Sequence, residues 1–345
     1  MSGLSQEFDR AQYMIDVKRY GEAVNLLASA VAADPGDSRG WCLLARAHAG
    51  QGQYAEAASA AGQAVALAPL DDWPHRLVSN AYMHLGDMAV AVRAAAEACR
   101  LAPNEWRAQL CLAQAALASR GQLGLAEHAA VTARAIAPDE PDVHFVSGQV
   151  SLARGNRKAA VAHHERALAL NPDHPGALNE LGRIRLSRAH TARAARHFLQ
   201  AARSAPQVHG YSQNIEVVVR RTVALVIYVA SVASVILTYL AITNHLPRVA
   251  VLAGLAAVAV FTAGFGAVQF QRMPRETRPL FRRRRIAQAL GISYGAILLG
   301  LVVAAVSPAQ DLADALVIVT VLIIASRFAA YGLLRREAIE SRRGA

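Results

Sequence analysis

Residues 175–206 read PGALNELGRIRLSRAHTARAARHFLQAARSAP, and they hold in compact form a pattern that runs through most of the chain. The stretch ends at Pro206, with Ala201 five residues and Ala194 twelve residues before it. Only small residues let two antiparallel helices approach closely where they cross, and a proline cannot continue a helix. The stretch therefore predicts two packed helices that end in a turn.

The same pattern recurs upstream at a nearly constant interval. The prolines are Pro35, Pro69, Pro103, Pro138, Pro172 and Pro206, at intervals of 34, 34, 35, 34 and 34 residues. The alanines twelve residues before them are Ala23, Ala57, Ala91, Ala126, Ala160 and Ala194. The alanines five residues before them are Ala30, Ala64, Ala98, Ala133, Ala167 and Ala201. This period predicts six helix-turn-helix repeats.

Proline and glycine indicate where the helices of each repeat end. Proline lacks a backbone N–H and restricts the residue before it, so the second helix should end just before each proline. A glycine marks the turn between the two helices in five repeats. These glycines are Gly21, Gly52, Gly86, Gly121 and Gly155. The fourth repeat has 35 residues, and we expect its insertion in the turn from Gly121 to Gly124.

These residues resemble the tetratricopeptide-repeat (TPR) family over residues 4–208. The last repeat matches the family pattern best, through Leu178, Leu181, Gly182, Ala194, Phe198 and Pro206. The resemblance implies an all-α fold in which six repeats stack into a right-handed superhelix. It also implies that the first helix of each pair lines a concave groove. It does not specify a function, because such repeats serve many partners.

Arginine and tryptophan gather on the helix faces that should line this groove, over the second to fourth repeats. The predicted groove residues are Arg39, Arg46, Trp73, Arg76, Asn80, Arg107, Gln114, Gln149, Asn179 and Arg183. Both residue types are enriched where proteins bind each other tightly. They would suit an extended peptide with acidic groups or a free carboxylate. The alternative is a solvated inner face without a dedicated ligand.

Four apolar segments follow the repeats, at about 222–243, 249–270, 286–306 and 312–334. Each approaches the ~20 residues that a helix needs to cross the hydrocarbon of a bilayer. We therefore expect a TPR domain at 1–208, a connecting segment at 209–221, a four-helix transmembrane bundle at 222–334 and a basic tail at 335–345.

The arginines flanking these segments predict the orientation. Arginines on the side of the repeats are Arg220, Arg221, Arg272, Arg275, Arg278, Arg282, Arg283, Arg284, Arg285, Arg335, Arg336, Arg342 and Arg343. The opposite loops hold only Arg248, against Asp311. Because cytoplasmic loops are rich in arginine, both termini and the repeats should be cytoplasmic. The loop from Arg272 to Arg285 should contact anionic lipid headgroups.

Two features of the last segments have a second interpretation. Arg327 lies inside the fourth segment, where it should snorkel toward the headgroups; a buried pairing is the alternative. Gly291 and Gly295 form a GxxxG pair, which allows close helix packing within the bundle or between copies of the chain. A homo-oligomer through these glycines is therefore a hypothesis.

Charge placement and missing motifs narrow the classes of function. Residues 1–206 carry 21 Lys+Arg against 19 Asp+Glu, whereas residues 207–345 carry 15 against 6, which argues against a nucleic-acid surface on the repeats. Phosphate-binding loops, dinucleotide fingerprints, zinc motifs and nucleophile elbows are missing, so we expect no catalytic residue, metal or cofactor. The cysteines Cys42, Cys99 and Cys111 have no metal-site spacing and should act as small buried hydrophobes.

The leading hypothesis is a non-enzymatic scaffold that recruits a cytoplasmic protein or peptide to the inner membrane. Arginine outnumbers lysine by 34 to 2, a bias that suggests a bacterial source. The alternative is a small transporter, channel or membrane-complex subunit regulated by the repeats. That alternative requires polar or broken helices at mid-depth, and the apolar segments here are uninterrupted.

Overall fold

The protein is helical throughout its described part. The structure, a computed structural model, describes residues 2–119, 121–188, 190–206, 208–243, 247–282 and 288–292, with scattered residues between 295 and 332. No β-strand occurs among these residues. The chain forms two compact units, Met1–Pro172 and Asp173–Ala345.

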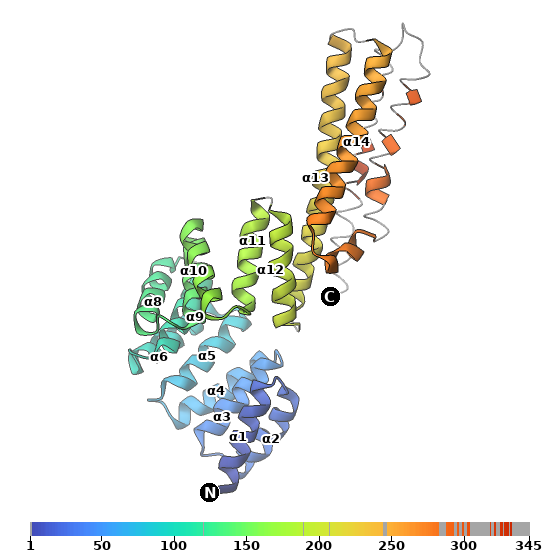
Figure 1. Cartoon of the computed structure of the whole chain (residues 1–345). Helices are drawn as coiled ribbons and strands as arrows, with labels where there is room; N and C mark the ends of the chain where they lie inside the picture. The colour runs from blue at the N-terminus through green and yellow to red at the C-terminus, as the bar shows by residue number, and fades with distance from the viewer. Residues whose placement is uncertain are drawn as a thin grey trace. The chain divides into compact units, whose positions relative to one another are not determined.

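The first unit is a stack of five helix pairs, coloured from blue to green in Figure 1. Its helices are α1 (Ser2–Asp16), α2 (Tyr20–Ala33), α3 (Ser38–Gly50), α4 (Tyr54–Leu67), α5 (Asp72–Leu85), α6 (Met88–Leu101), α7 (Trp106–Ala118), α8 (Leu123–Ile136), α9 (Pro141–Ala153) and α10 (Arg157–Leu170). Each odd-numbered helix packs on the even-numbered helix that follows it, and successive odd-numbered helices also contact one another.

The alanines and prolines have the roles that their spacing predicts. Each of the twelve repeated alanines is at most 2% exposed. Each second helix ends two residues before its proline, and the N–H of the capping residue donates to the carbonyl of the second alanine, as Ala68 does to Ala64. The alanine therefore serves both the helix crossing and the helix end.

Larger residues enter the crossing only where the opposite helix carries glycine. Gly182 lies under the ring of Phe198, and a Cβ at this glycine would come within 2.6 Å of the ring. Gly148 lies under the ring of His164 in the same way, so His164 is a fully buried packing residue. The equivalent pairs in the second, third and fourth repeats are Ala45 with Ala61, Ser79 with Ala95, and Ala113 with Ala130.

The turns confirm four of the five predicted glycines and correct one. Gly52, Gly86, Gly121 and Gly155 have φ between +78° and +88°, the left-handed region that favours glycine. Gly21 instead lies inside α2, and Lys18 adopts the left-handed conformation in the first turn, with φ of 63°. The prediction for Gly21 is wrong because a glycine near a turn need not occupy its left-handed position.

A repeated hydrogen bond connects each proline turn to the helix that follows it. The donor is the side chain six residues after the proline, and the acceptor is the carbonyl oxygen of the proline itself. The pairs are Trp41 with Pro35 (3.0 Å), His75 with Pro69 (3.0 Å), Gln109 with Pro103 (3.2 Å) and His144 with Pro138 (2.7 Å). Each bond contributes about 0.5–1.5 kcal/mol and holds the first turn of the next helix in place.

The second unit joins the sixth repeat to an apolar helix pair (Figure 1). Its elements are α11 (Pro175–Ser187), α12 (Thr191–Ser204), α13 (His209–Thr243), α14 (Arg248–Arg272) and a 3-10 helix, η1 (Arg275–Arg282). The start of α13 packs on α12, and Asn214 Nδ2 donates to Asn179 Oδ1 at 2.7 Å. Residues 209–221, expected as a connecting segment, are thus continuous with the first apolar segment.

Two helices of the described part are long and apolar enough to cross a bilayer. They cover Gly210–Ile236 and Val249–Arg272, with mean hydropathies of 1.7 and 2.2. Length and composition alone do not separate a membrane span from the core helix of a soluble protein. The expected spans at 286–306 and 312–334, with Arg327, fall largely outside the described residues, so the four-helix bundle stays a prediction.

The buried crossing generates the first testable prediction. Replacing Ala91 of α6 with phenylalanine should lower the free energy of unfolding by about 1–3 kcal/mol, because the ring overpacks the crossing. The measurement is urea unfolding of residues 1–172, followed by circular dichroism. The same substitution at Ala96, an exposed position on α6, should change stability by less than about 0.5 kcal/mol. Equal losses at both positions would contradict the assigned crossing.

Candidate functional site

The odd-numbered helices of the first unit form one continuous surface, because each contacts the next odd-numbered helix. Their first turns are capped by an acidic side chain that recurs every 34 residues. Asp37, Asp71 and Glu105 each accept a hydrogen bond from the backbone N–H two residues later, at 2.8, 3.1 and 3.1 Å. The caps hold the helix starts, and so place Trp73 and Arg107 at matching heights on neighbouring helices.

Six predicted groove residues surround one cavity of about 460 Å³, called here the groove pocket. They are Arg46, Trp73, Arg76, Asn80, Arg107 and Gln114. The pocket also takes Tyr20, Trp106 and Asp142, which the sequence interpretation did not select. It spans helices from several repeats, as a site for an extended ligand must.

The three arginines of the groove pocket have carboxylate neighbours of unequal strength. Arg76 bonds to Asp72 at 2.6 Å, and both side chains are about one-fifth exposed. Arg46 lies 3.5 Å from Asp16 and donates to Gln12 Oε1 at 2.7 Å, whereas Arg107 lies 3.4 Å from Glu105. Long contacts at exposed positions contribute little. Arg46 and Arg107 thus keep donors for a ligand, while Arg76 is committed to its own helix.

Two indole rings give the groove pocket its apolar surface. Trp73 and Trp106 are both half-buried, and the Arg107 guanidinium lies 4.3 Å from the centroid of the Trp106 ring. A stacked guanidinium keeps its edge N–H groups open to a carboxylate while its face contacts the ring. Trp106 was missed because it is the first residue of α7 rather than a residue of the inner face; its signal was an aromatic beside the predicted Arg107.

Four predicted groove residues lie outside this pocket. Arg39 pairs with Asp9 at 2.6 Å, and Gln149 is half-buried on α9. In the second unit, Asn179 is bonded to Asn214 and Arg183 pairs with Glu180 at 2.9 Å. Their proposed contact with a ligand stays a prediction.

The structure describes only part of the predicted basic loop. Arg278 donates to the carbonyl of Gln271 at 3.3 Å and lies 5.4 Å from the Phe270 ring centroid. Arg272 lines a cavity of about 450 Å³ with Arg193 and Arg196 of α12. Arg283, Arg284 and Arg285 fall outside the described residues, as does the side chain of Arg282.

The described residues contain no group of three or more His, Cys, Asp or Glu side chains placed to hold a metal ion. Burial raises the pKa of the Cys42 and Cys99 thiols to about 12 and also raises the pKa of Cys111. Since only the thiolate is a strong nucleophile, these cysteines are chemically inert at neutral pH and act in packing.

The stacked helix pairs and the ligand-accessible inner surface define the class of helical-repeat interaction proteins. A family profile described as "Tetratricopeptide repeat" matches residues 14–81, and a second with the same description matches residues 145–209. The chain therefore contains tetratricopeptide repeats. No curated protein matches the chain.

Solved structures share the fold at low sequence identity. A tetratricopeptide repeat protein from Parabacteroides merdae ATCC 43184 has a TM-score of 0.56 and 14% identity, and the match covers 63% of this chain and 84% of that one. The APC/C hetero-tetramer Cut9–Hcn1 gives 0.53 and 16%, over 61% of this chain and 42% of that one. A thermophilic TPR protein of Thermus thermophilus gives 0.48 and 22%, over 51% and 95%. The first two likenesses support the fold alone.

The buried thiols generate the second prediction. Labelling by iodoacetamide at pH 8 should be slow in the native protein and should accelerate on unfolding, because the thiolate fraction rises as each pKa returns to its ordinary value. A raised folded pKa of an acid stabilises the fold below the unfolded pKa near 9, and this stability is lost as pH rises toward about 12. Stability should therefore fall above about pH 9, and less so in a Cys42→Ala variant. Fast native labelling of all three thiols would contradict their burial.

Proposed function

We propose that this protein is a membrane-anchored scaffold that binds a cytoplasmic protein partner through the groove pocket. The observation that carries the proposal is the pocket itself, with two half-buried indoles beside two arginines that retain free donors. Tryptophan and arginine dominate the binding energy of many interfaces. The proposed contact set comprises the ten groove residues predicted from the sequence, with Trp106 added.

The proposed ligand is an extended segment that carries an apolar or aromatic side chain and a carboxylate. The indoles of Trp73 and Trp106 would contact the apolar side chain, and the edge of the Arg107 guanidinium would take the carboxylate. Asp142 and Glu105 lie near the same pocket and would repel a strongly acidic peptide. One carboxylate beside an apolar anchor fits this balance better than an acidic run.

Three observations support anchoring by α13 and α14. Thr222 and Val223 of α13 line one apolar cavity with Ala267 and Phe270 of α14, so the two apolar segments begin and end at the same level. Only 17% of the apolar window of α14 is buried, and Val249 and Val260 are 78% and 74% exposed. Exposing such side chains to water is unfavourable, by about 1.5–3 kcal/mol for each large one, whereas lipid accommodates them.

The cationic cavity at the end of α14 supports an orientation. Arg193, Arg196 and Arg272 line it, and they have no ion pair within the described residues. Arginines at this level would face the headgroups of a cytoplasmic leaflet. We therefore propose four spans with both termini and the repeats in the cytoplasm of a bacterial cell, with the loop from Arg272 to Arg285 on anionic lipid.

Self-association is proposed through the paired glycines of the third segment. A Cβ at Gly291 or at Gly295 would meet nothing within 4 Å, so both positions offer an open, flat surface. A second helix could approach such a surface closely. Arg327 is proposed to snorkel toward the headgroups from the fourth segment.

The third prediction tests the groove. The Trp73→Ala/Trp106→Ala variant should weaken partner binding by at least about tenfold, since hot-spot residues contribute ~2 kcal/mol or more each. The measurement is quantitative recovery of partners on full-length protein solubilised from its membranes, followed by titration of peptides taken from the recovered partners. An Arg93→Ala variant, exposed on α6 and outside the groove pocket, is the control. Equal recovery by both variants would refute the groove assignment.

The fourth prediction tests the topology. Reporter fusions after Gly210, Glu276 and Ala345 should report the cytoplasm, and fusions after His245 and Gln310 the outside. The charge asymmetry of the flanking loops is the physical reason. An outside signal from the fusion after Gly210 would overturn the proposed orientation, and an inside signal after His245 would remove the first span.

A further inference from the structure

Arg134 of α8 breaks the repeat pattern at a core position. It stands four residues before Pro138, where every other repeat has an apolar or small residue. The residues at that position are Val31, Val65, Cys99, Leu168 and Ala202. A guanidinium at an otherwise apolar position weakens packing, so the substitution calls for a specific role.

Ser147 of α9 breaks the pattern at a second position. It stands nine residues after Pro138, where the other repeats that follow a proline turn have a branched apolar residue. Those residues are Leu44, Val78, Leu112 and Leu181. Ser147 is 3% exposed, so a polar group replaces an apolar side chain inside the repeat junction.

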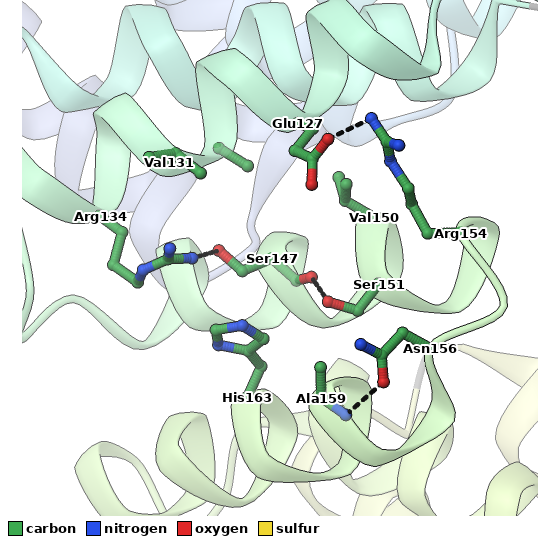
Figure 2. Close-up of a pocket in the computed structure, with 11 residues that line it drawn as sticks. Glu127, Val131, Arg134, Ser147, Val150, Ser151, Arg154, Asn156, Ala159 and His163 are labelled. Atoms are coloured by element: carbon green, nitrogen blue, oxygen red, sulfur yellow. Dashed lines mark hydrogen bonds and ion pairs between the residues drawn. The ribbon is translucent and has the colours of Figure 1, made fainter.

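The two exceptions meet, and together they open a cavity. Arg134 Nη1 donates to Ser147 Oγ at 3.2 Å, and Ser147 Oγ donates to the Val143 carbonyl at 2.8 Å. A cavity of about 410 Å³, called here the repeat-five recess, lies beside this pair between α8, α9 and α10. Figure 2 shows Arg134 and His163 at one end of the recess, with Glu127, Arg154 and Asn156 at the other.

The charges in the recess leave one arginine uncompensated. Glu127 and Arg154 form an ion pair with each other. Arg134 has no carboxylate partner among the described residues, and only one of its five N–H donors is used by Ser147. Burial, followed by the charges of Arg134 and His144, lowers the pKa of His163, so its imidazole is neutral at neutral pH. The net positive charge therefore amounts to one.

Hydrogen-bonding groups remain at the far end of the recess. Asn156 Oδ1 accepts from the N–H of Ala159 at 3.0 Å, which leaves its amide NH₂ group for a ligand. Ser151 Oγ donates to the Ser147 carbonyl at 2.9 Å and retains acceptor capacity. A ligand of matching size can thus be held at both ends.

We propose that the repeat-five recess binds a small organic monocarboxylate with a second hydrogen-bonding group, such as a hydroxy acid. The carboxylate takes the free edge of the Arg134 guanidinium and a ring N–H of His163. The second group reaches the Asn156 amide. A single charge fits because the recess offers one uncompensated cation, and Glu127 repels a dianion. This site is distinct from the groove pocket, with which it shares no lining residue.

The test uses the full chain in a nonionic detergent, with glycolate as the probe and its neutral analogue glycolamide as the matched control. Near-saturating glycolate should raise the melting temperature by about 2–4 °C, whereas glycolamide, and chloride at equal ionic strength, should not. The variant Arg134→Leu/Ser147→Leu restores the apolar pair of the other repeats. It should melt no lower than the wild type and should lose the glycolate shift.

Two further variants keep the test decisive. Arg134→Gln should weaken glycolate binding at least about tenfold by calorimetry, without refilling the recess. Arg166→Leu removes an exposed arginine of α10 that pairs with Asp139 and should leave glycolate binding unchanged. The proposal is overturned if glycolate produces no shift in the wild type, or if the double leucine variant keeps the shift. Stronger Arg134-dependent binding of inorganic phosphate, or of acidic peptides only, would overturn the ligand class.

Discussion

The close crossing of the two helices in each repeat is the constraint on which the rest of the structure depends. Twelve alanines keep the crossing narrow, and a ring enters only opposite a glycine, as Phe198 does over Gly182. Alanine loses no rotamer entropy on burial, so close backbone contact is gained at little entropic cost. The larger apolar residues are then free to join one repeat to the next, which explains why the pattern survives great variation elsewhere.

Because the crossing is periodic, much of the fold was predictable from the sequence. Every second helix ends two residues before its proline. The error at Gly21 has a physical cause, since the turn requires a left-handed residue at one position and Lys18 occupies it. The ion pairs of the groove were not predictable, because Arg46 meets Asp16 from the preceding repeat. The choice of carboxylate depends on side-chain geometry between helices, which a linear pattern does not contain.

The repeat architecture also permits local exceptions that a single globular core would not tolerate. Each repeat contacts mainly its neighbours, so a polar pair such as Arg134 and Ser147 perturbs one junction and leaves the others apolar. The regular positions supply stability, and the exceptions can be read as sites with another role. The same logic applies to the groove pocket, where Trp73 and Trp106 occupy positions that the crossing does not constrain.

The sixth repeat and the apolar helices share one hydrophobic core, and this has a mechanical consequence. Phe198 of α12 belongs to the same buried cluster as Val219, Val223 and Ile227 of α13 and Met273 beyond α14. Further along α13 the side chains become exposed, as Ile236 is at 53%. One uninterrupted helix thus serves first as the packing partner of a repeat and then as an apolar surface. Since a continuous α-helix has no hinge, the sixth repeat is held rigidly to that apolar surface, and loosening the packing around Phe198 would disturb both at once.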